Sequence, residues 1–151
     1  MKEAFRVIEA MAVNEEKISE LYRKFSSLFP GDSALWDKLV EDEKNHAFLI
    51  RDFGKMLRDS DIRFNPNRFT LDNMEMFRKF LENSIQESGG MGREKCLETA
   101  AQIERSLVEA ETFAVFESDV ADMKMLFGIL EKETKKHYDM ITELMGGSKN
   151  N

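Results

Sequence analysis

Apolar residues recur at alternating intervals of three and four residues along four long stretches of this chain. This spacing places one apolar stripe along each of four amphipathic helices and is typical of the contact lines in a helical bundle. The four stripes are Ile8, Met11, Glu15, Ile18, Tyr22, Phe25 and Phe29; Trp36, Leu39, Glu43, His46, Ile50, Phe53 and Leu57; Leu97, Ala100, Glu104, Leu107, Glu111 and Ala114; and Phe127, Leu130, Thr134, His137, Ile141 and Leu144. Each stripe is apolar at both ends and carries polar residues near its middle.

Residues that break helices set the limits of the four stretches. Proline and glycine are scarce, with Pro 2 and Gly 8 among 151 residues, which favours an all-α chain. Pro30-Gly31 ends the first helix, and Ser33 is a good N-terminal cap for the second. The helices are expected at about residues 2–28, 33–58, 93–117 and 120–145, the last capped by Ser118 or Asp119, with a shorter helix at about 71–85 and an irregular segment at 60–70.

The lengths of the connections predict how the helices are arranged. Short links make the first and second helices antiparallel neighbours, and likewise the third and fourth. The link between the second and third helices covers residues 60–92, so it can return along a bundle roughly 37 Å long and let those two helices run parallel. The expected fold is an all-α four-helix bundle over residues 1–146. It consists of two antiparallel hairpins joined by a long crossover that contains a short helix, and a disordered tail follows at 147–151.

The overall composition excludes several classes of protein. The formal net charge is −7 at pH 7, and a nucleic-acid partner needs a basic face, so none is expected. The single cysteine, Cys96, has no second cysteine to pair with, which favours a reducing compartment. No apolar run approaches the roughly 20 residues of a membrane span, and the charged N-terminal residues are unlike a signal peptide. A cytoplasmic protein without a membrane partner is expected.

Five polar residues, termed the midpoint residues, stand near the middle of the four stripes: Glu15, Glu43, His46, Glu104 and His137. In an antiparallel hairpin the midpoints lie at one level, so all five are expected to meet in one layer of the core. A buried carboxylate or imidazole is costly unless it is hydrogen-bonded, paired or bound to a metal. Both groups are ligands of iron, manganese and zinc. Glu41 and Asp42 fall outside the stripe and are expected in solvent.

The two histidines of the chain strengthen the metal interpretation. A single buried histidine is more often a hydrogen-bonded core residue than a ligand, and a single glutamate in a stripe often lies at the edge of a bundle. Here His46 and His137 occupy matching positions in the second and fourth helices, each opposite a stripe that carries a glutamate. Glutamates packed together would repel one another and take up protons, whereas two cations would remove that repulsion.

These residues resemble the ferritin-like superfamily, and within it the rubrerythrin-like proteins. The resemblance extends from about Phe5 to Leu144. It rests on Glu15 with Tyr22, Glu43-x-x-His46, Glu104 in Ala100-Ala101-Gln102-Ile103-Glu104, and Glu133-Thr134-Lys135-Lys136-His137. Ferritin-like carboxylate proteins take one Glu from each of two helices and a Glu-x-x-His motif from each of the other two. The resemblance implies two bound metal ions, with iron expected and manganese or zinc open. Their ligands would be the midpoint residues, and no catalytic residue is expected apart from these ligands.

One position departs from that pattern. The second motif reads Thr134-x-x-His137, so a neutral hydroxyl stands where the pattern has a carboxylate. Three interpretations are open. Glu133, four residues before His137, could act as a substitute ligand; the site could hold one ion strongly and the other weakly; or the site could bind no metal.

Further polar residues are expected beside the ligands. Tyr22 either donates a hydrogen bond to a ligand carboxylate or serves as a core aromatic residue, and Thr134 is expected to lie next to the ligands. Glu111 has in the third helix the position that Tyr22 has in the first. Two helical turns, roughly 10 Å, separate Glu111 from Glu104, which is too far to share its metal. Glu111 is therefore expected to pair across the bundle or to lie at an interface with a partner.

The resemblance implies a non-haem dimetal protein that reduces peroxide or oxidises ferrous iron, and it implies a homodimer. Full rubrerythrins also carry a rubredoxin domain with four cysteine ligands, which one cysteine cannot supply. Redox activity would therefore need an external electron donor. The alternative is a ferritin-like scaffold with a degenerate site that acts in metal handling or protein interaction, which Thr134 supports.

Overall fold

The fold is described by a computed structural model, which covers residues 3–58, 69–117 and 121–149. Within these ranges the structure contains helices and no strand, so the predicted all-α class is confirmed. The helices are α1 (Glu3–Leu28), α2 (Ser33–Arg58), α3 (Leu71–Glu87), α4 (Arg93–Glu117) and α5 (Ala121–Lys149), with short 3-10 helices at Pro30–Asp32 and Ser88–Gly90.

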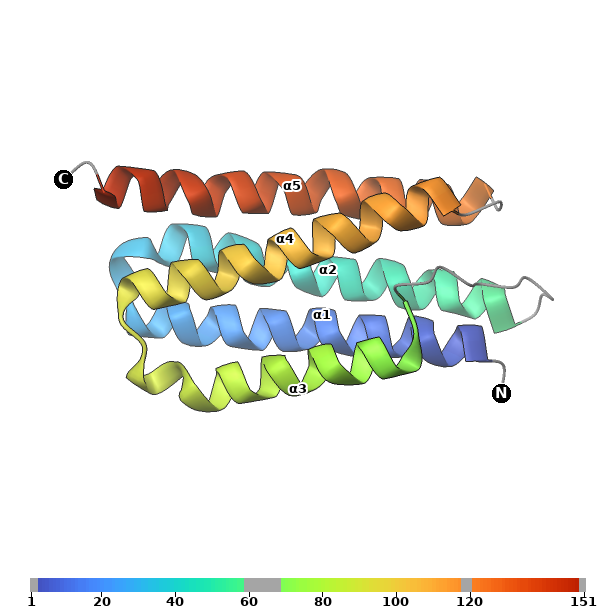
Figure 1. The fold of residues 1–151 in the computed structure, drawn as a ribbon, viewed down its shortest axis with the longest axis horizontal. Coiled ribbons are helices and arrows are strands. Elements are labelled where there is room, and N and C mark those ends of the chain that lie inside the picture. The colour runs from blue at the N-terminus through green and yellow to red at the C-terminus, as the bar shows by residue number, and fades with distance from the viewer. Residues whose placement is uncertain (1–2, 59–68, 118–120, 150–151) are drawn as a thin grey trace.

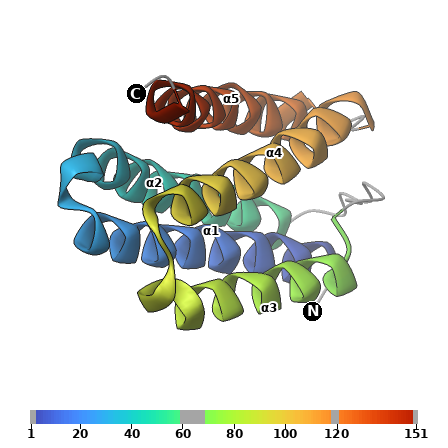
Figure 2. The ribbon, with the colours of Figure 1, turned by 60° about the vertical axis from the view of Figure 1, so that its left-hand side comes forward.

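Four long helices form a bundle, and the shorter α3 lies along its outside. Helices α1 and α2 run side by side in opposite directions, as do α4 and α5 (Figures 1 and 2). Helix α3 packs along α1 and returns the chain toward the link between α1 and α2, so α4 starts near the start of α2 and runs in the same direction. This is the predicted order of two antiparallel hairpins with a helix in the connection between them.

Local sequence signals explain where most of the helices begin and end. Helix α2 starts at Ser33 directly after the 3-10 helix that contains Pro30. The Thr70 hydroxyl caps α3 by accepting a hydrogen bond from the backbone N–H of Asn73 at 3.1 Å. At the other end of the connection, the Arg93 guanidinium donates two hydrogen bonds to the Asp32 carboxylate, at 2.7 and 3.1 Å. This pair fixes the start of α4 to the link between α1 and α2.

The C-terminal helix is longer than expected. Helix α5 continues to Lys149, beyond residue 146, after which the sequence predicts a disordered tail. Each glycine costs a helix about 1 kcal/mol relative to alanine, but a residue added at a helix end still gains a backbone hydrogen bond. The last two residues of the tail lie outside the described residues, as do the predicted cap residues Ser118 and Asp119 and residues 60–68 of the expected irregular segment.

The core consists of two apolar clusters with a polar layer between them. One cluster includes Ile8, Ile50 and Phe127, and the other includes Tyr22, Trp36 and Ile141. Along each long helix, the buried glutamates and histidines come between the parts that enter the two clusters. The polar layer is therefore enclosed on both sides by apolar side chains.

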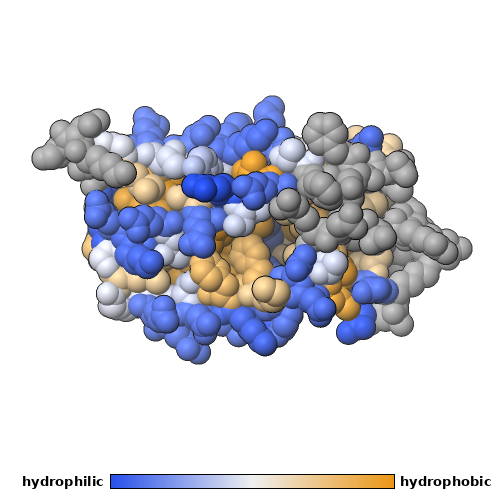
Figure 3. All heavy atoms as spheres, in the orientation of Figure 1, coloured by the Kyte–Doolittle hydropathy of each residue, from blue (hydrophilic) through white to orange (hydrophobic). Residues whose placement is uncertain are grey.

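The surface is mainly hydrophilic, with apolar side chains between the charged ones. Figure 3 shows hydrophilic groups along both long margins of one face and hydrophobic groups gathered in the band between them. The exposed large apolar side chains are Phe48, Leu49, Met56, Met76, Phe80, Met125 and Ile129. None of the described helices is both long and apolar enough to cross a membrane.

Candidate metal centre

All five midpoint residues are buried in the polar layer. The exposed fraction of each is 4% or less, as it is for Glu111 and Thr134 in the same layer. Each of the four long helices contributes to the layer, because each stripe places its midpoint residues on the buried face. The 3-4 spacing therefore brings these side chains together from parts of the chain as far apart as Glu15 and His137.

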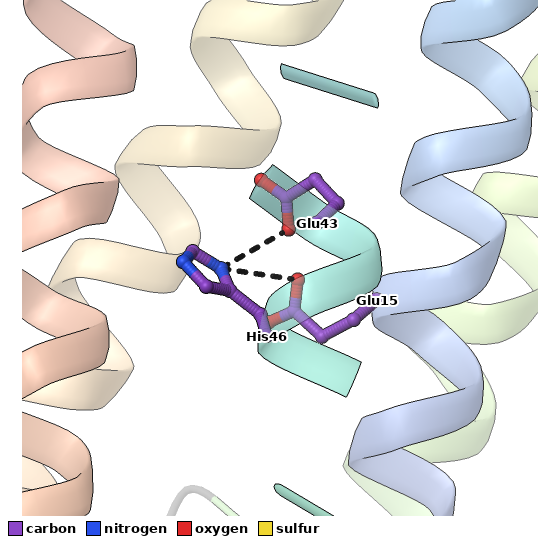
Figure 4. Close-up of side chains that lie close together, drawn as sticks. All are labelled: Glu15, Glu43 and His46. Carbon is purple, nitrogen blue, oxygen red and sulfur yellow. Dashed lines mark ion pairs between the residues drawn. The ribbon is translucent and has the colours of Figure 1, made fainter. Parts of the chain in front are cut away.

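Three of these side chains form a first group on α1 and α2. Nδ1 of His46 lies 3.5 Å from Oε2 of Glu43 and 4.0 Å from Oε2 of Glu15 (Figure 4). The imidazole nitrogen and both carboxylates converge on one point, and one ligand atom from each residue lies within 4.8 Å of the other two. We call these residues the Glu15 group.

A second group joins α2 to α4 and α5. Nδ1 of His137 lies 3.2 Å from Oε1 of Glu43 and 3.6 Å from Oε1 of Glu104. We call these residues the Glu104 group. Glu43 belongs to both groups and presents a different oxygen to each histidine. The two imidazole rings are stacked, with centroids 5.7 Å apart and an angle of 22° between their planes.

Carboxylates also face the outer nitrogens of both histidines. Nε2 of His137 lies 2.9 Å from Oδ2 of Asp42, and Nε2 of His46 lies 3.3 Å from Oε2 of Glu133. The pairing is crosswise, because Asp42 precedes His46 by four residues and Glu133 precedes His137 by four residues. The expectation that Asp42 lies in solvent is wrong, since its side chain is only 17% exposed. Glu41, by contrast, is exposed as expected.

The position of Glu133 bears on the three interpretations of Thr134. Glu133 is half-buried, and its carboxylate faces the outer nitrogen of His46 instead of filling the place beside Thr134. One of its oxygens also lies within 4.8 Å of ligand atoms of Asp42 and His137, in a third, partly exposed group that shares His137 with the Glu104 group and could itself hold a metal ion. This placement suits either a residue that orients an imidazole or a ligand, so the three interpretations stay open.

Tyr22 has both of the roles that were expected for it. Its hydroxyl donates a hydrogen bond to Oε1 of Glu104 at 3.0 Å. Its ring packs against Trp36 and Phe25, with centroid distances of 5.3 and 6.1 Å. The hydrogen bond fixes one oxygen of Glu104 and links α1 to α4 across the bundle.

Burial and mutual repulsion shift the pKa values of the glutamates. Burial, followed by the charge of Glu43, holds the pKa of Glu15 well above its usual value and raises that of Glu104 to about 7. Burial also holds the pKa of Glu111 well above its usual value. Burial would raise the pKa of Glu43 as well, but its interactions with Glu15 and the two histidines outweigh burial and hold this pKa well below its usual value.

The histidines shift in the opposite sense to ordinary buried imidazoles. Burial disfavours the charged imidazolium, but the adjacent Glu43 carboxylate outweighs it and raises the pKa of His46 to about 9. Burial acts in the same way on His137, but the adjacent carboxylates of Glu104 and Glu43 outweigh it and raise its pKa to about 11. Without metal, the layer therefore holds its excess negative charge by binding protons.

The layer also meets the geometric needs of metal ions. Several buried atoms have no hydrogen-bond partner, including one oxygen each of Glu15, Glu43 and Glu104 and both ring nitrogens of His46. Bonds of about 2.1 Å place two ligand atoms of one ion between about 3.0 and 4.2 Å apart, from adjacent to opposite positions. The four distances from the Nδ1 atoms, which run from 3.2 to 4.0 Å, fall within these limits.

Comparisons with known proteins add no further constraint on the centre. No protein-family model matches the chain. No curated protein and no solved structure matches it either. The support for a metal centre comes from the buried layer itself, with its two carboxylate-imidazole groups and the glutamate that they share.

Proposed function

We propose that this chain is a ferritin-like, rubrerythrin-like protein that binds two metal ions in the polar layer, with iron as the expected metal. The observation that carries the proposal is the position of Glu43, which presents one oxygen to each of two buried histidines. Glu15, Glu43 and His46 would hold one ion, and Glu43, Glu104 and His137 would hold the other. Oxygen and imidazole ligands also suit manganese and zinc.

The chemistry proposed for the centre is peroxide reduction or oxidation of ferrous iron. Bound iron would supply reversible exchange of electrons between its ferrous and ferric states. The chain has one cysteine and therefore no four-cysteine electron-transfer site within it, so electrons for peroxide reduction would come from a separate donor. The apolar clusters on both sides of the layer limit the access of water, while Tyr22 holds Glu104 in place.

The outer carboxylates have a defined part in this proposal. A metal-binding histidine usually donates its other ring N–H to a carboxylate, which fixes the tautomer and the ring orientation. Asp42 stands in that position at Nε2 of His137, and Glu133 is close to it at Nε2 of His46. Both arrangements leave Nδ1 free to face the inner carboxylates.

Metal content after anaerobic loading with ferrous iron tests the proposal. We expect two ions per chain by elemental analysis. Glu43→Gln removes the shared carboxylate charge, so this variant should lose at least one ion, whereas the exposed neighbour variant Glu41→Gln should retain both. Loaded protein with a chemical reductant should then consume peroxide. A wild-type chain that takes up no iron, manganese or zinc would refute the dimetal proposal.

The alternative function is a ferritin-like scaffold whose degenerate site binds one ion or none. The neutral Thr134 favours it, because the chain lacks the carboxylate that the pattern has at this position. Under this alternative, Thr134→Glu should raise the metal content of the chain, and the wild type should show no peroxide turnover.

We also propose that the chain forms a homodimer, as the resemblance implies, and that it does so in the cytoplasm, which the single cysteine favours. Exposed apolar side chains such as Met76 and Phe80 on α3 and Met125 on α5 could be covered in a dimer. Light scattering coupled to size-exclusion chromatography should give twice the chain mass. A monomeric mass over the micromolar range would contradict the dimer without affecting the metal proposal.

A further inference from the structure

Glu111 is an additional carboxylate in the polar layer. Its side chain is 2% exposed within this single chain, so it lies in the core and not at a partner interface. Its Oε1 has no hydrogen-bond partner. The group interacts electrostatically with His46, Glu104 and Glu43, and its charge acts on Glu15 as well. An unpaired carboxylate buried among three others is costly unless a positive charge compensates for it.

Glu111 lies beside the residue that breaks the ligand pattern. Thr134, which is itself 1% exposed, is one of the polar residues that act on the Glu111 carboxyl group. The Thr134 hydroxyl donates to the backbone carbonyl of Leu130 at 2.7 Å, which turns the hydroxyl hydrogen away from the layer. Threonine is shorter than glutamate, so the space that a glutamate at this position would fill borders the Glu111 carboxylate.

We propose that Glu111 supplies the fourth carboxylate of the dimetal centre, in the place that Thr134 leaves vacant. This inference rests on the dimetal centre proposed above and names a ligand that the sequence pattern does not assign. The carboxylate would come from α4 instead of α5, and Thr134 would leave room for it.

Charge balance supports a role for Glu111 in place of the carboxylate that is missing at position 134. A ligand set of four glutamates and two neutral histidines exactly matches the charge of two divalent cations, whereas three glutamates leave one positive charge uncompensated in the core. Glu15, Glu43, Glu104 and Glu111 restore the four carboxylates that the ferritin-like pattern requires. The chain would have lost one carboxylate at Thr134 and gained one on the facing helix.

The separation along α4 does not prevent this role. Glu111 stands two turns from Glu104, but α4 is inclined across the bundle (Figures 1 and 2), so successive turns of α4 face different neighbours. Glu111 is absent from the two tight groups, so binding requires its side chain to rotate toward them.

Four chains should be compared by anaerobic equilibrium dialysis against ferrous iron, followed by elemental analysis: wild type, Glu111→Gln, Thr134→Glu and the double variant. Glu111→Gln should bind the second ion at least about tenfold more weakly. The double variant, which places a carboxylate at position 134, should again bind two ions per chain. Thr134→Glu alone should bind two ions per chain, as the wild type does. The exposed residue two positions away gives the matched control Glu109→Gln, which should behave as the wild type.

The outcomes separate this inference from the proposed function. Two ions at wild-type affinity in Glu111→Gln would overturn the role of Glu111 and leave the dimetal centre standing. If the wild type binds one ion and Thr134→Glu binds two, the role of Glu111 is overturned in favour of the degenerate site. No metal in the wild type would overturn both. Circular dichroism of each metal-free variant checks its fold, and glutamine matches the protonated form that the buried acid adopts without metal.

Discussion

At the scale of single residues, the carboxylates behind the histidines should control metal affinity without binding metal themselves. Asp42→Asn leaves the shape of the side chain but removes the charge that holds the Nε2–H of His137. We expect a loss of about ten- to a hundredfold in the affinity for the ion in the Glu104 group. Equilibrium dialysis with Mn²⁺ measures this affinity, and Glu41→Gln on the same helix is the control. An affinity within twofold of the wild type would show that Asp42 does not position the imidazole.

The residue scale also shows where sequence reasoning stops. The five midpoint residues were predictable, because a 3-4 stripe fixes which side chains face the core and antiparallel pairing fixes their level. The role of Asp42 was not predictable, because this residue lies beside the stripe and its carboxylate contacts a histidine on another helix. One signal was present: Asp42 and Glu133 each precede a histidine by four residues. Their crosswise pairing, however, depends on how α2 packs against α5.

Of the two placements expected for Glu111, burial within the single chain excludes the partner interface and leaves the position inside the bundle. Its place in the stripe already indicated burial. Which residues surround it was not predictable, because side chains in a bundle meet across helices: Thr134 on α5 and His46 on α2 both act on Glu111.

At the scale of helices, two glycines offer a matched test of how closely α1 and α2 approach. A Cβ added at Gly54 in α2 would lie 3.0 Å from Cγ2 of the buried Ile8 in α1, whereas one at Gly128 in α5 would meet nothing within 4 Å. Gly128→Ala should therefore stabilise the metal-free chain by about 0.5–1 kcal/mol. Gly54→Ala should gain less or lose stability, because overpacking offsets the gain in helix propensity.

Urea denaturation followed by circular dichroism measures both free energies of unfolding. Equal stabilisation by the two alanines would mean that α1 moves easily away from α2 at Gly54.

The close approach of α1 and α2 was not predictable from the sequence, because an isolated glycine in a helical pattern has no distinctive sequence context. The helix limits were predictable at Pro30 and Thr70, where a breaker and a cap act locally. The start of α2 at Ser33 was also predictable, but Ser33 has helical backbone angles and is not the cap that the sequence suggests. The C-terminal limit of α5 was predicted wrongly, because no such signal forces the helix to stop there.

At the scale of the whole molecule, the polar layer should make the stability of the metal-free chain fall as the pH rises. The pKa values of Glu104, His46 and His137 are raised to about 7, 9 and 11, so the folded chain binds more protons than the unfolded chain above the usual glutamate value. Each extra proton bound in the folded state lowers stability by about 1.4 kcal/mol per pH unit of increase. The lowered pKa of Glu43 has the opposite effect, but only below its usual value.

The melting temperature of the metal-free chain should therefore decrease from about pH 5 to pH 9. Metal ions take the place of the protons on the inner nitrogens and carboxylates, so metal affinity should increase over the same range, with protons released on binding. Differential scanning calorimetry with and without Mn²⁺ measures both trends, and proton release can be followed in a weakly buffered titration. A metal-free melting temperature that rises with pH would mean that the buried acids and imidazoles do not share the excess protons. In that case metal ions would have no excess protons to displace from the layer, so the predicted increase of metal affinity with pH would fail as well.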